Sequence, residues 1–241
     1  DYSEMEEIDR YALHRLHEVI RQVTSAYAAY EFHRVYHAAH NYCAVDLSSF
    51  YLDILKDRLY VSAQDCRKRR SAQTALHEIT SALARVVAPV LAHTADEVWL
   101  RLPEKGKEES VHLARFPEAR SDRIDEELAG RWDKILEVRQ KVLCALEEAR
   151  QSGKIGKPLE SRIKLTAPAK LYEFLKTYEV VLASVFIVSR VELAECVTGD
   201  LEVEVDQPPG SKCERCWLVL ESVGGSPEHP TLCDRCVSAI S

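Results

Sequence analysis

The sequence predicts a mainly α-helical protein, with an antiparallel helical bundle followed by a small α/β domain and a C-terminal four-cysteine ribbon. Residues 1–101 contain no glycine and a single proline, and their apolar residues recur at helical spacing. After Pro158 the pattern changes to short, alternating segments. Two CxxC pairs then follow near the C-terminus. We expect three parts, with boundaries at 1–125, 126–207 and 208–241.

The first part is expected to contain five amphipathic helices joined by short connections, which is the pattern of an antiparallel bundle. Ser3 and Glu6 fit a capping box that opens the first helix. The remaining helices are expected to begin near Glu31, after Asp46 or Ser48, at Ser71 and at Thr94. The charged stretch 104–125 is interpreted as a loop or linker.

The second part begins with a helix over 126–152, which has one apolar stripe and ends near a pair of glycines. Shorter elements are expected after it: a strand over Arg162–Thr166, a helix over Lys170–Tyr178, at least one strand within Val180–Leu193, and an alternating segment over Leu201–Val205. These elements predict a small α/β domain. Pro208-Pro209-Gly210 separates it from the C-terminal segment.

The C-terminal segment carries Cys213 and Cys216 as one CxxC pair and Cys233 and Cys236 as another, with sixteen residues between the pairs. This is the spacing of a zinc ribbon, in which two tight turns supply a closed tetrahedral set of thiolates. We therefore expect one structural zinc ion with no open coordination position. Disulfides are disfavoured, because no secretory signal is recognisable and the other cysteines are scattered singly. A cytoplasmic location is expected.

Composition and the absence of known motifs restrict the classes of function that this sequence suggests. The net charge of −7 argues against a broadly basic nucleic-acid-binding surface, and no apolar run reaches the roughly twenty residues that span a membrane. No phosphate loop, nucleophile elbow or HExxH motif occurs, so no catalytic residue is predicted. His33, His37 and His40 share helical spacing, and we expect them to have polar partners in or beside the bundle core.

Local basic clusters remain as candidates for nucleic-acid contact. The first is Arg67, Lys68, Arg69 and Arg70; the second is Lys154, Lys157, Arg162 and Lys164; the ribbon adds Lys212, Arg215 and Arg235 beside Trp217. A charge run is usually a solvated face, so each cluster alone is weak support. Trp217 is equally compatible with covering the metal site and with stacking on an unpaired base.

Several segments resemble one family, and they follow its order. They are EIDRYAL at Glu7–Leu13, AYEFHRVYHAAHNYCAVDLSSFYLDILKDRLY at Ala29–Tyr60, RRSAQTALHEI at Arg69–Ile79 and VVAPVLAHTADEVW at Val86–Trp99. Together they resemble the anticodon-binding helical bundle of class I aminoacyl-tRNA synthetases, most closely that of the bacterial-type isoleucyl-tRNA synthetases. The ending KCERCW…LCDRC resembles the zinc module of the same family.

The resemblance implies the C-terminal region of an isoleucine–tRNA ligase, which recognises the anticodon stem-loop of isoleucine tRNA and positions it for aminoacylation. The HIGH and KMSKS signatures are absent, so catalytic and editing domains are expected to lie outside this chain. The family's pattern places Arg215 and Trp217 at the anticodon loop. Lys212, Arg235 and the run from Arg67 to Arg70 are added by charge and position alone.

Two alternatives accompany this interpretation. A similar ribbon ends the formamidopyrimidine-type DNA glycosylases, but this chain lacks their N-terminal proline and neighbouring glutamate, so no DNA partner is expected. The second alternative is a non-catalytic module whose bundle and ribbon bind another protein. The salt dependence of RNA binding separates this second alternative from the tRNA-binding interpretation, since contacts to several phosphates weaken steeply as salt rises.

Overall fold

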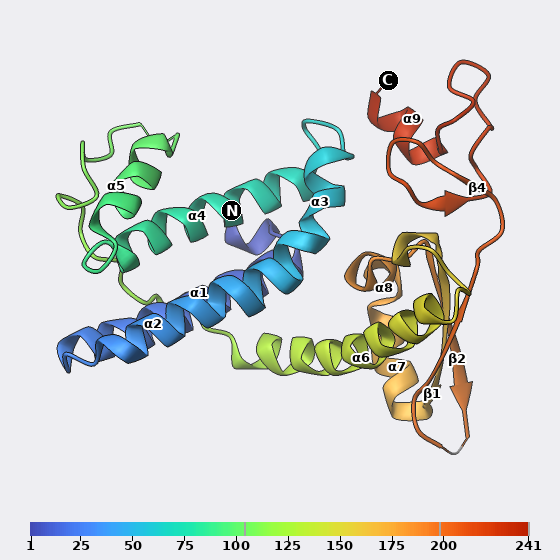
Figure 1. The fold of residues 1–241 in the computed structure, drawn as a ribbon, viewed down its shortest axis with the longest axis horizontal. Coiled ribbons are helices and arrows are strands. Elements are labelled where there is room, and N and C mark those ends of the chain that lie inside the picture. Colours follow the sequence, from blue (N-terminus) through green and yellow to red (C-terminus); the bar gives the residue numbers. More distant parts are fainter. Residues whose placement is uncertain (104, 198, 241) are drawn as a thin grey trace. The chain divides into compact units, whose positions relative to one another are not determined.

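The structure is a computed structural model, and it describes residues 1–103, 105–197 and 199–240 (Figure 1). The chain divides into two compact units. The first contains residues 1–59 and 64–129, and the second contains residues 60–63 and 130–241. The short segment 60–63 therefore belongs to the same unit as the C-terminal half of the chain.

The first unit is a helical bundle, as predicted. Its elements are a 3-10 turn η1 (Tyr2–Glu4), α1 (Glu7–Ala28), α2 (Phe32–Asn41), a π-helical segment η2 (Tyr42–Tyr51), α3 (Leu52–Tyr60), α4 (Arg67–Val87), α5 (Ala92–Arg101) and a 3-10 turn η3 (Ser121–Arg123). The helix α1 packs against α2, η2 and α4. Its apolar stripe, which includes Leu13, Leu16 and Ile20, is buried in the core of this unit.

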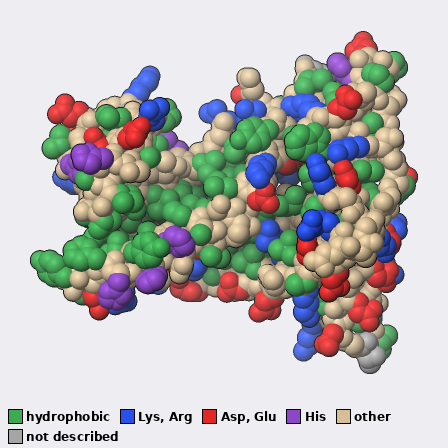
Figure 2. Space-filling view, viewed as in Figure 1, with side chains coloured by type: hydrophobic (Ala, Val, Ile, Leu, Met, Phe, Trp, Pro, Cys, Tyr) green, Lys and Arg blue, Asp and Glu red, His purple; other side chains and the backbone are tan. Residues whose placement is uncertain are grey.

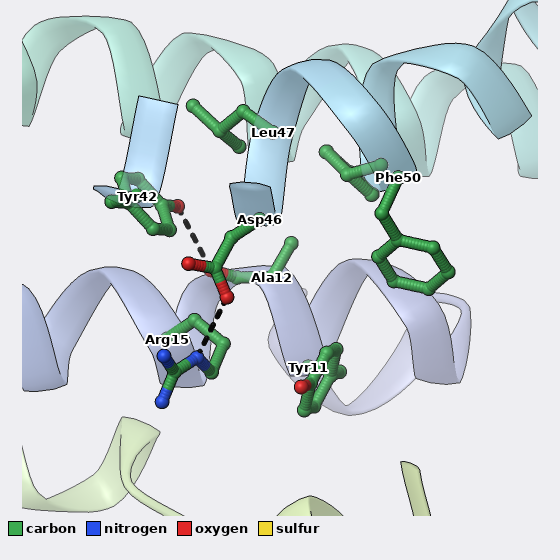
Figure 3. Close-up of a pocket in the computed structure, with 8 residues that line it drawn as sticks. Tyr11, Ala12, Arg15, Tyr42, Asp46, Leu47 and Phe50 are labelled. Carbon is green, nitrogen blue, oxygen red and sulfur yellow. Dashed lines mark hydrogen bonds and ion pairs between the residues drawn. The ribbon is translucent and has the colours of Figure 1, made fainter. Parts of the chain in front are cut away.

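The expected break between the second and third helices is absent. Residues 32–60 are helical throughout, because α2, η2 and α3 follow one another directly. Asp46, expected as a helix cap, instead accepts a hydrogen bond of 2.9 Å from Nε of Arg15 on α1. Tyr42 donates to the carbonyl of Ala12, also on α1 (Figure 3). These side chains line a cavity of only about 10 Å³, which is at most room for one water molecule.

Buried polar groups connect the other helices of the bundle. The carboxylate of Asp9, which has no exposed surface, accepts hydrogen bonds of 2.9 Å and 2.6 Å from the guanidinium of Arg58. The hydroxyls of Tyr51 and Ser71 also donate to it. Ser71 was expected to open the fourth helix, but α4 begins at Arg67. Ser71 lies one turn inside α4, where its hydroxyl accepts a hydrogen bond from the backbone N–H of Glu6 and donates one to Asp9 of α1.

This buried pair supports a stability prediction. Arg58→Ala leaves the Asp9 carboxylate buried without its cationic partner, which typically costs about 3–5 kcal/mol. We expect the free energy of unfolding of the bundle, measured by urea denaturation, to fall by that amount. Lys56→Ala is the matched control, because Lys56 pairs with Asp53 on the exposed side of α3. Equal stability of the two variants would contradict a structural role for the buried pair.

The second unit continues from the long helix α6, and its topology is simple. Its elements are α6 (Glu126–Gln151), a 3-10 turn η4 (Pro158–Glu160), β1 (Arg162–Pro168), α7 (Ala169–Thr177), α8 (Glu179–Phe186), β2 (Arg190–Cys196), β3 (Glu202–Asp206), β4 (Ser211–Lys212), β5 (Val219–Leu220) and α9 (Asp234–Ile240). Three strands form a sheet in the order β2-β1-β3, with β1 parallel to β2 and antiparallel to β3. The predicted combination of short helices and strands in this part of the chain is confirmed.

The β-branched stretch Val180–Leu193 was expected to contain at least one strand, and this is confirmed because β2 begins at Arg190. The first half of that stretch is the helix α8, which buries Leu182, Val185 and Phe186. Their spacing of three and four residues is helical, and the run of β-branched residues concealed it.

No helix within the described residues is both long enough and apolar enough to cross a membrane.

Candidate metal centre and nucleic-acid interface

The first cysteine pair sits in a short hairpin. The strands β4 and β5 pair antiparallel, and the chain between them forms the turn that holds Cys213 and Cys216. The backbone N–H of Cys213 donates to the carbonyl of Leu218 at 2.9 Å, which closes this turn. Gly210 precedes β4 with φ of 109°, and a Cβ there would lie 2.4 Å from the backbone of Leu220. Only glycine allows this approach.

The four predicted ligands meet at one point. Cys233 and Cys236 lie at the start of α9, and their thiols join those of Cys213 and Cys216 with all four sulfurs within 4.8 Å of one another. All four side chains are buried. The sulfurs of Cys216 and Cys233 are 3.7 Å apart. Zinc–sulfur bonds of about 2.3 Å in a tetrahedron place the sulfurs about 3.8 Å apart, so the cluster fits zinc.

Backbone hydrogen bonds lower the pKa of one of the four thiols, which favours the thiolate that binds a metal. Burial raises the pKa of the Cys213 thiol, but backbone N–H groups of Cys216, Cys233 and Arg215 outweigh it and lower the pKa to about 6. Burial raises the pKa of Cys216 and of Cys236, and the neighbouring Cys233 adds to the effect on Cys236. The protons on these thiols leave when a divalent metal binds, because thiolates are the ligands.

A distant segment completes the surroundings of the cluster. Val61 is buried against the four cysteines, within an apolar group that also contains Leu218, Leu220, Val223 and Leu232. Its carbonyl accepts a hydrogen bond of 2.5 Å from Nη1 of Arg215, 154 residues later in the sequence. The sequence gives no signal for this contact, since Val61 lies in an unremarkable turn between α3 and α4.

Trp217, which follows the first cysteine pair, is exposed. Its side chain retains 59% of its accessible surface, so its indole does not close over the metal site. Its backbone has φ of 65°, in the left-handed region, and its N–H donates to the carbonyl of Cys213 at 2.9 Å. Such a conformation costs a non-glycine residue about 1–3 kcal/mol and is common at functional sites. The turn therefore holds a flat aromatic group towards solvent.

The three basic residues of the ribbon all have partners inside the second unit. Lys212 donates to Oε1 of Glu160 at 2.7 Å, and this contact lowers the pKa of the Glu160 carboxyl. Arg215 donates to the carbonyl of Val61 as described. The guanidinium groups of Arg215 and Arg235 counter the burial that raises the pKa of the Cys236 and Cys216 thiols. The charges predicted for RNA contact are therefore also part of the ribbon's own structure.

The run from Arg67 to Arg70 forms the first turn of α4 in the first unit. The guanidinium of Arg67 donates to the carbonyl of Glu4 at 2.9 Å and 2.5 Å. Lys68 and Arg70 are exposed, whereas Arg69 is half-buried. Four cations at a helix N-terminus oppose the helix dipole, and the first turn carries no acidic residue. The arrangement concentrates positive potential at one end of α4.

Three of the four residues of the second basic cluster, Lys154, Arg162 and Lys164, lie beside acidic residues. Lys154 lies 2.8 Å from Asp206, and Lys164 lies 3.5 Å from Glu204. The register of the sheet places Lys164 directly opposite Glu204, so the basic residues of β1 face the acidic residues of β3. Cross-strand pairs of this kind stabilise a sheet and leave little net charge. Figure 2 shows acidic and basic side chains intermingled on the visible face of the molecule.

The expectation for the histidines of α2 was wrong. His33, His37 and His40 are exposed rather than placed in or beside the core. Tyr36 lies between two of them, with ring centroids 5.2 Å from His37 and 5.4 Å from His40. The buried side of this short helix is held by Val35 instead.

Comparison with known proteins identifies the family of this chain. Residues 9–165 match the family described as the anticodon-binding domain of tRNA ligase. This chain belongs to that family. Residues 210–239 match a second family, described as a zinc finger found in FPG and IleRS, which covers the four-cysteine ribbon. The family match and the cysteine geometry both indicate that the ribbon binds zinc.

Curated relatives of this chain are isoleucine–tRNA ligases. That of Carboxydothermus hydrogenoformans is 48% identical over 245 residues, covering 99% of this chain and 26% of the relative. Those of Syntrophotalea carbinolica and Moorella thermoacetica are 49% and 47% identical, over 98% and 99% of this chain. The chain spans about a quarter of the length of these relatives.

The metal assignment is tested by removing one ligand. Cys213→Ser takes away the thiol whose pKa is lowered to about 6, and we expect the purified protein to lose its zinc, since three thiolates do not close the site. Amide hydrogen exchange should then accelerate in residues 211–240, while α6 stays protected. Cys144→Ser is the control, because Cys144 is an exposed free thiol. Full zinc content in Cys213→Ser would contradict the assignment.

Proposed function

We propose that this chain is the tRNA-binding C-terminal region of an isoleucine–tRNA ligase. In this role it recognises the anticodon stem-loop of isoleucine tRNA and positions the tRNA for aminoacylation by a catalytic domain outside these residues. Membership of the anticodon-binding family and the names of the relatives support the proposal. The proposal includes one zinc ion per chain, a cytoplasmic location, and the division at 1–125, 126–207 and 208–241.

The observation that carries the proposal is the exposure of Trp217. RNA is recognised mainly through unpaired loop bases, which stack on aromatic side chains and hydrogen-bond along their edges. A tryptophan with 59% of its surface exposed, on a metal-fixed turn, offers such a stacking face. Its strained backbone is explained if the turn serves to present the ring. Arg215 flanks it in the same turn and keeps further N–H donors beyond those it uses internally.

The basic first turn of α4 is the second contact that we propose. Lys68 and Arg70 are exposed at a helix N-terminus, where backbone N–H groups already favour an anion. Phosphates of the tRNA backbone suit this concentration of positive charge. The interaction of these cations with the helix dipole is unfavourable, and the first turn of α4 contains no acidic residue to offset it. Such contacts position the tRNA, while the base contacts made by the ribbon discriminate between tRNAs.

Substitution of Trp217 tests the proposal. Trp217→Ala should weaken binding of isoleucine tRNA by about 1–3 kcal/mol, which is roughly 5–150-fold in Kd, because one stacked base loses its platform. Fluorescence anisotropy with labelled tRNA measures this change. Trp217→Phe keeps an aromatic face and should recover most of the affinity.

The matched control is Ile240→Ala, which removes another exposed apolar side chain of the ribbon. It should bind tRNA like the unaltered protein. Unchanged affinity in Trp217→Ala would contradict the stacking role, and tRNA affinity that does not respond to salt would favour the protein-interaction alternative.

A further inference from the structure

Two buried histidines of α1 accept hydrogen bonds from one connecting segment. The segment 120–125 contains η3 and leads directly into α6. The backbone N–H of Asp125 donates to Nδ1 of His14 at 2.9 Å. The backbone N–H of Arg120 donates to Nδ1 of His17 at 3.2 Å. The two histidines share one face of α1, because residues three apart on a helix are neighbours, and they hold both ends of the segment.

Both imidazoles are enclosed by the bundle. The side chains of His14 and His17 retain only 1% and 6% of their accessible surface. Since the two N–H groups point at buried rings, loss of the acceptor leaves a polar group facing the interior, which is costly. A ring nitrogen accepts only while it carries no proton, so each imidazole is neutral with its proton on Nε2. In His14 this proton faces the carboxylate of Glu18, whose Oε2 lies 3.5 Å from Nε2.

The segment 120–125 ends with the residue that starts α6. Asp125 caps this helix, because its Oδ1 accepts a hydrogen bond of 2.9 Å from the N–H of Leu128. Residues 126–129, the first turn of α6, belong to the first unit, and the same helix continues into the second unit from Gly130. The two histidine contacts therefore lie within the first unit, at the point where the long helix begins.

The charges around His17 oppose its protonation. Arg123 and Arg120 of the segment act on it, and Asp122 offsets them only in part. Its titratable neighbour on α1 is His14, which acts in the same direction as the arginines. Burial is the main cause that lowers the pKa of His17 to about 4, and the two guanidinium groups add to the effect. The imidazole of His17 is therefore neutral, and able to accept, at neutral pH.

We propose that His14 and His17 form a proton-sensitive clamp that fixes the start of α6 on the bundle. A proton on Nδ1 turns the acceptor into a donor, which repels the backbone N–H and releases the segment. The stabilisation that His17 provides is complete above the ordinary histidine pKa of 6.5, and it is lost as the pH falls from there towards 4. The clamp is closed at neutral pH and opens on acidification. It does not depend on the proposed tRNA contacts.

Amide hydrogen exchange of the complete chain tests the clamp, with NMR detection of the Arg120 and Asp125 amides. His17→Leu removes one acceptor. The protection factor of the Arg120 amide at pH 7 should then fall about 5–150-fold, the range expected when a polar group facing the interior loses its partner. His14→Leu should have the same effect on the Asp125 amide. His33→Leu is the matched control, because His33 is exposed on α2, and both amides should stay protected in it.

An asparagine variant separates protonation from packing. The Oδ1 of asparagine lies close to the position of the histidine Nδ1 and accepts a hydrogen bond without titrating. His17→Asn should therefore keep the Arg120 amide protected at pH 7, and this protection should not fall between pH 6.5 and 4. In the unaltered chain it should fall across that interval. Amides inside α4 should stay protected in both chains, which distinguishes release of the segment from unfolding of the bundle.

Three outcomes would overturn the proposal. They are full protection of the Arg120 amide in His17→Leu, a loss at pH 7 in His17→Asn as large as in His17→Leu, and the same pH dependence in His17→Asn as in the unaltered chain. If α4 loses its protection together with the Arg120 amide, acid unfolds the whole bundle and the clamp is rejected. If His17→Leu does not fold, the comparison of His17→Asn with the unaltered chain across pH still decides.

Discussion

Four buried thiols lie at the centre of the small apolar cluster that holds the C-terminal segment together. Its strands β4 and β5 contain two residues each, and α9 contains seven, so the metal supplies the constraint that packing supplies elsewhere. The position of Trp217 follows from this constraint. The turn around Cys213 forces its backbone into the left-handed region and leaves the indole exposed. The proposed RNA contact therefore depends on zinc although the metal takes no part in recognition.

A buried charge has the corresponding role in the bundle. Arg58 pairs with Asp9 and also donates to the carbonyl of Lys68, and Arg67 donates to the carbonyl of Glu4. The first turn of α4 is thus anchored by its backbone and by one arginine, while Lys68 and Arg70 remain exposed. In each unit, residues with structural partners fix the course of the backbone. The exposed side chains extend from this fixed backbone. In the proposed function, this arrangement pre-organises the RNA contacts of each unit, which lowers the entropic cost of association.

Local patterns in the sequence were sufficient for the fold class, the family and the four cysteines that the structure brings together. The helix α6 ends within a residue of its predicted limit, since an apolar stripe and terminal glycines define it. Contacts between residues far apart in the sequence were not predicted. Ser71 bonds Asp9 instead of capping a helix, Lys164 is neutralised by Glu204 across the sheet, and Val61 packs on cysteines far along the chain. Periodicity and spacing carry no information on such long-range pairs.

The central claim is that this chain distinguishes tRNAs by their anticodon. The most direct test compares its Kd for isoleucine tRNA with its Kd for the same tRNA carrying a changed anticodon, at one fixed salt concentration. The account predicts weaker binding of the changed tRNA, because hydrogen bonds to the edges of its anticodon bases are lost. Stacking on Trp217 accepts any base and adds affinity to both tRNAs. Equal affinity for the two tRNAs, with both bound through salt-dependent contacts, would contradict anticodon recognition. It would indicate binding to the RNA backbone that is independent of sequence.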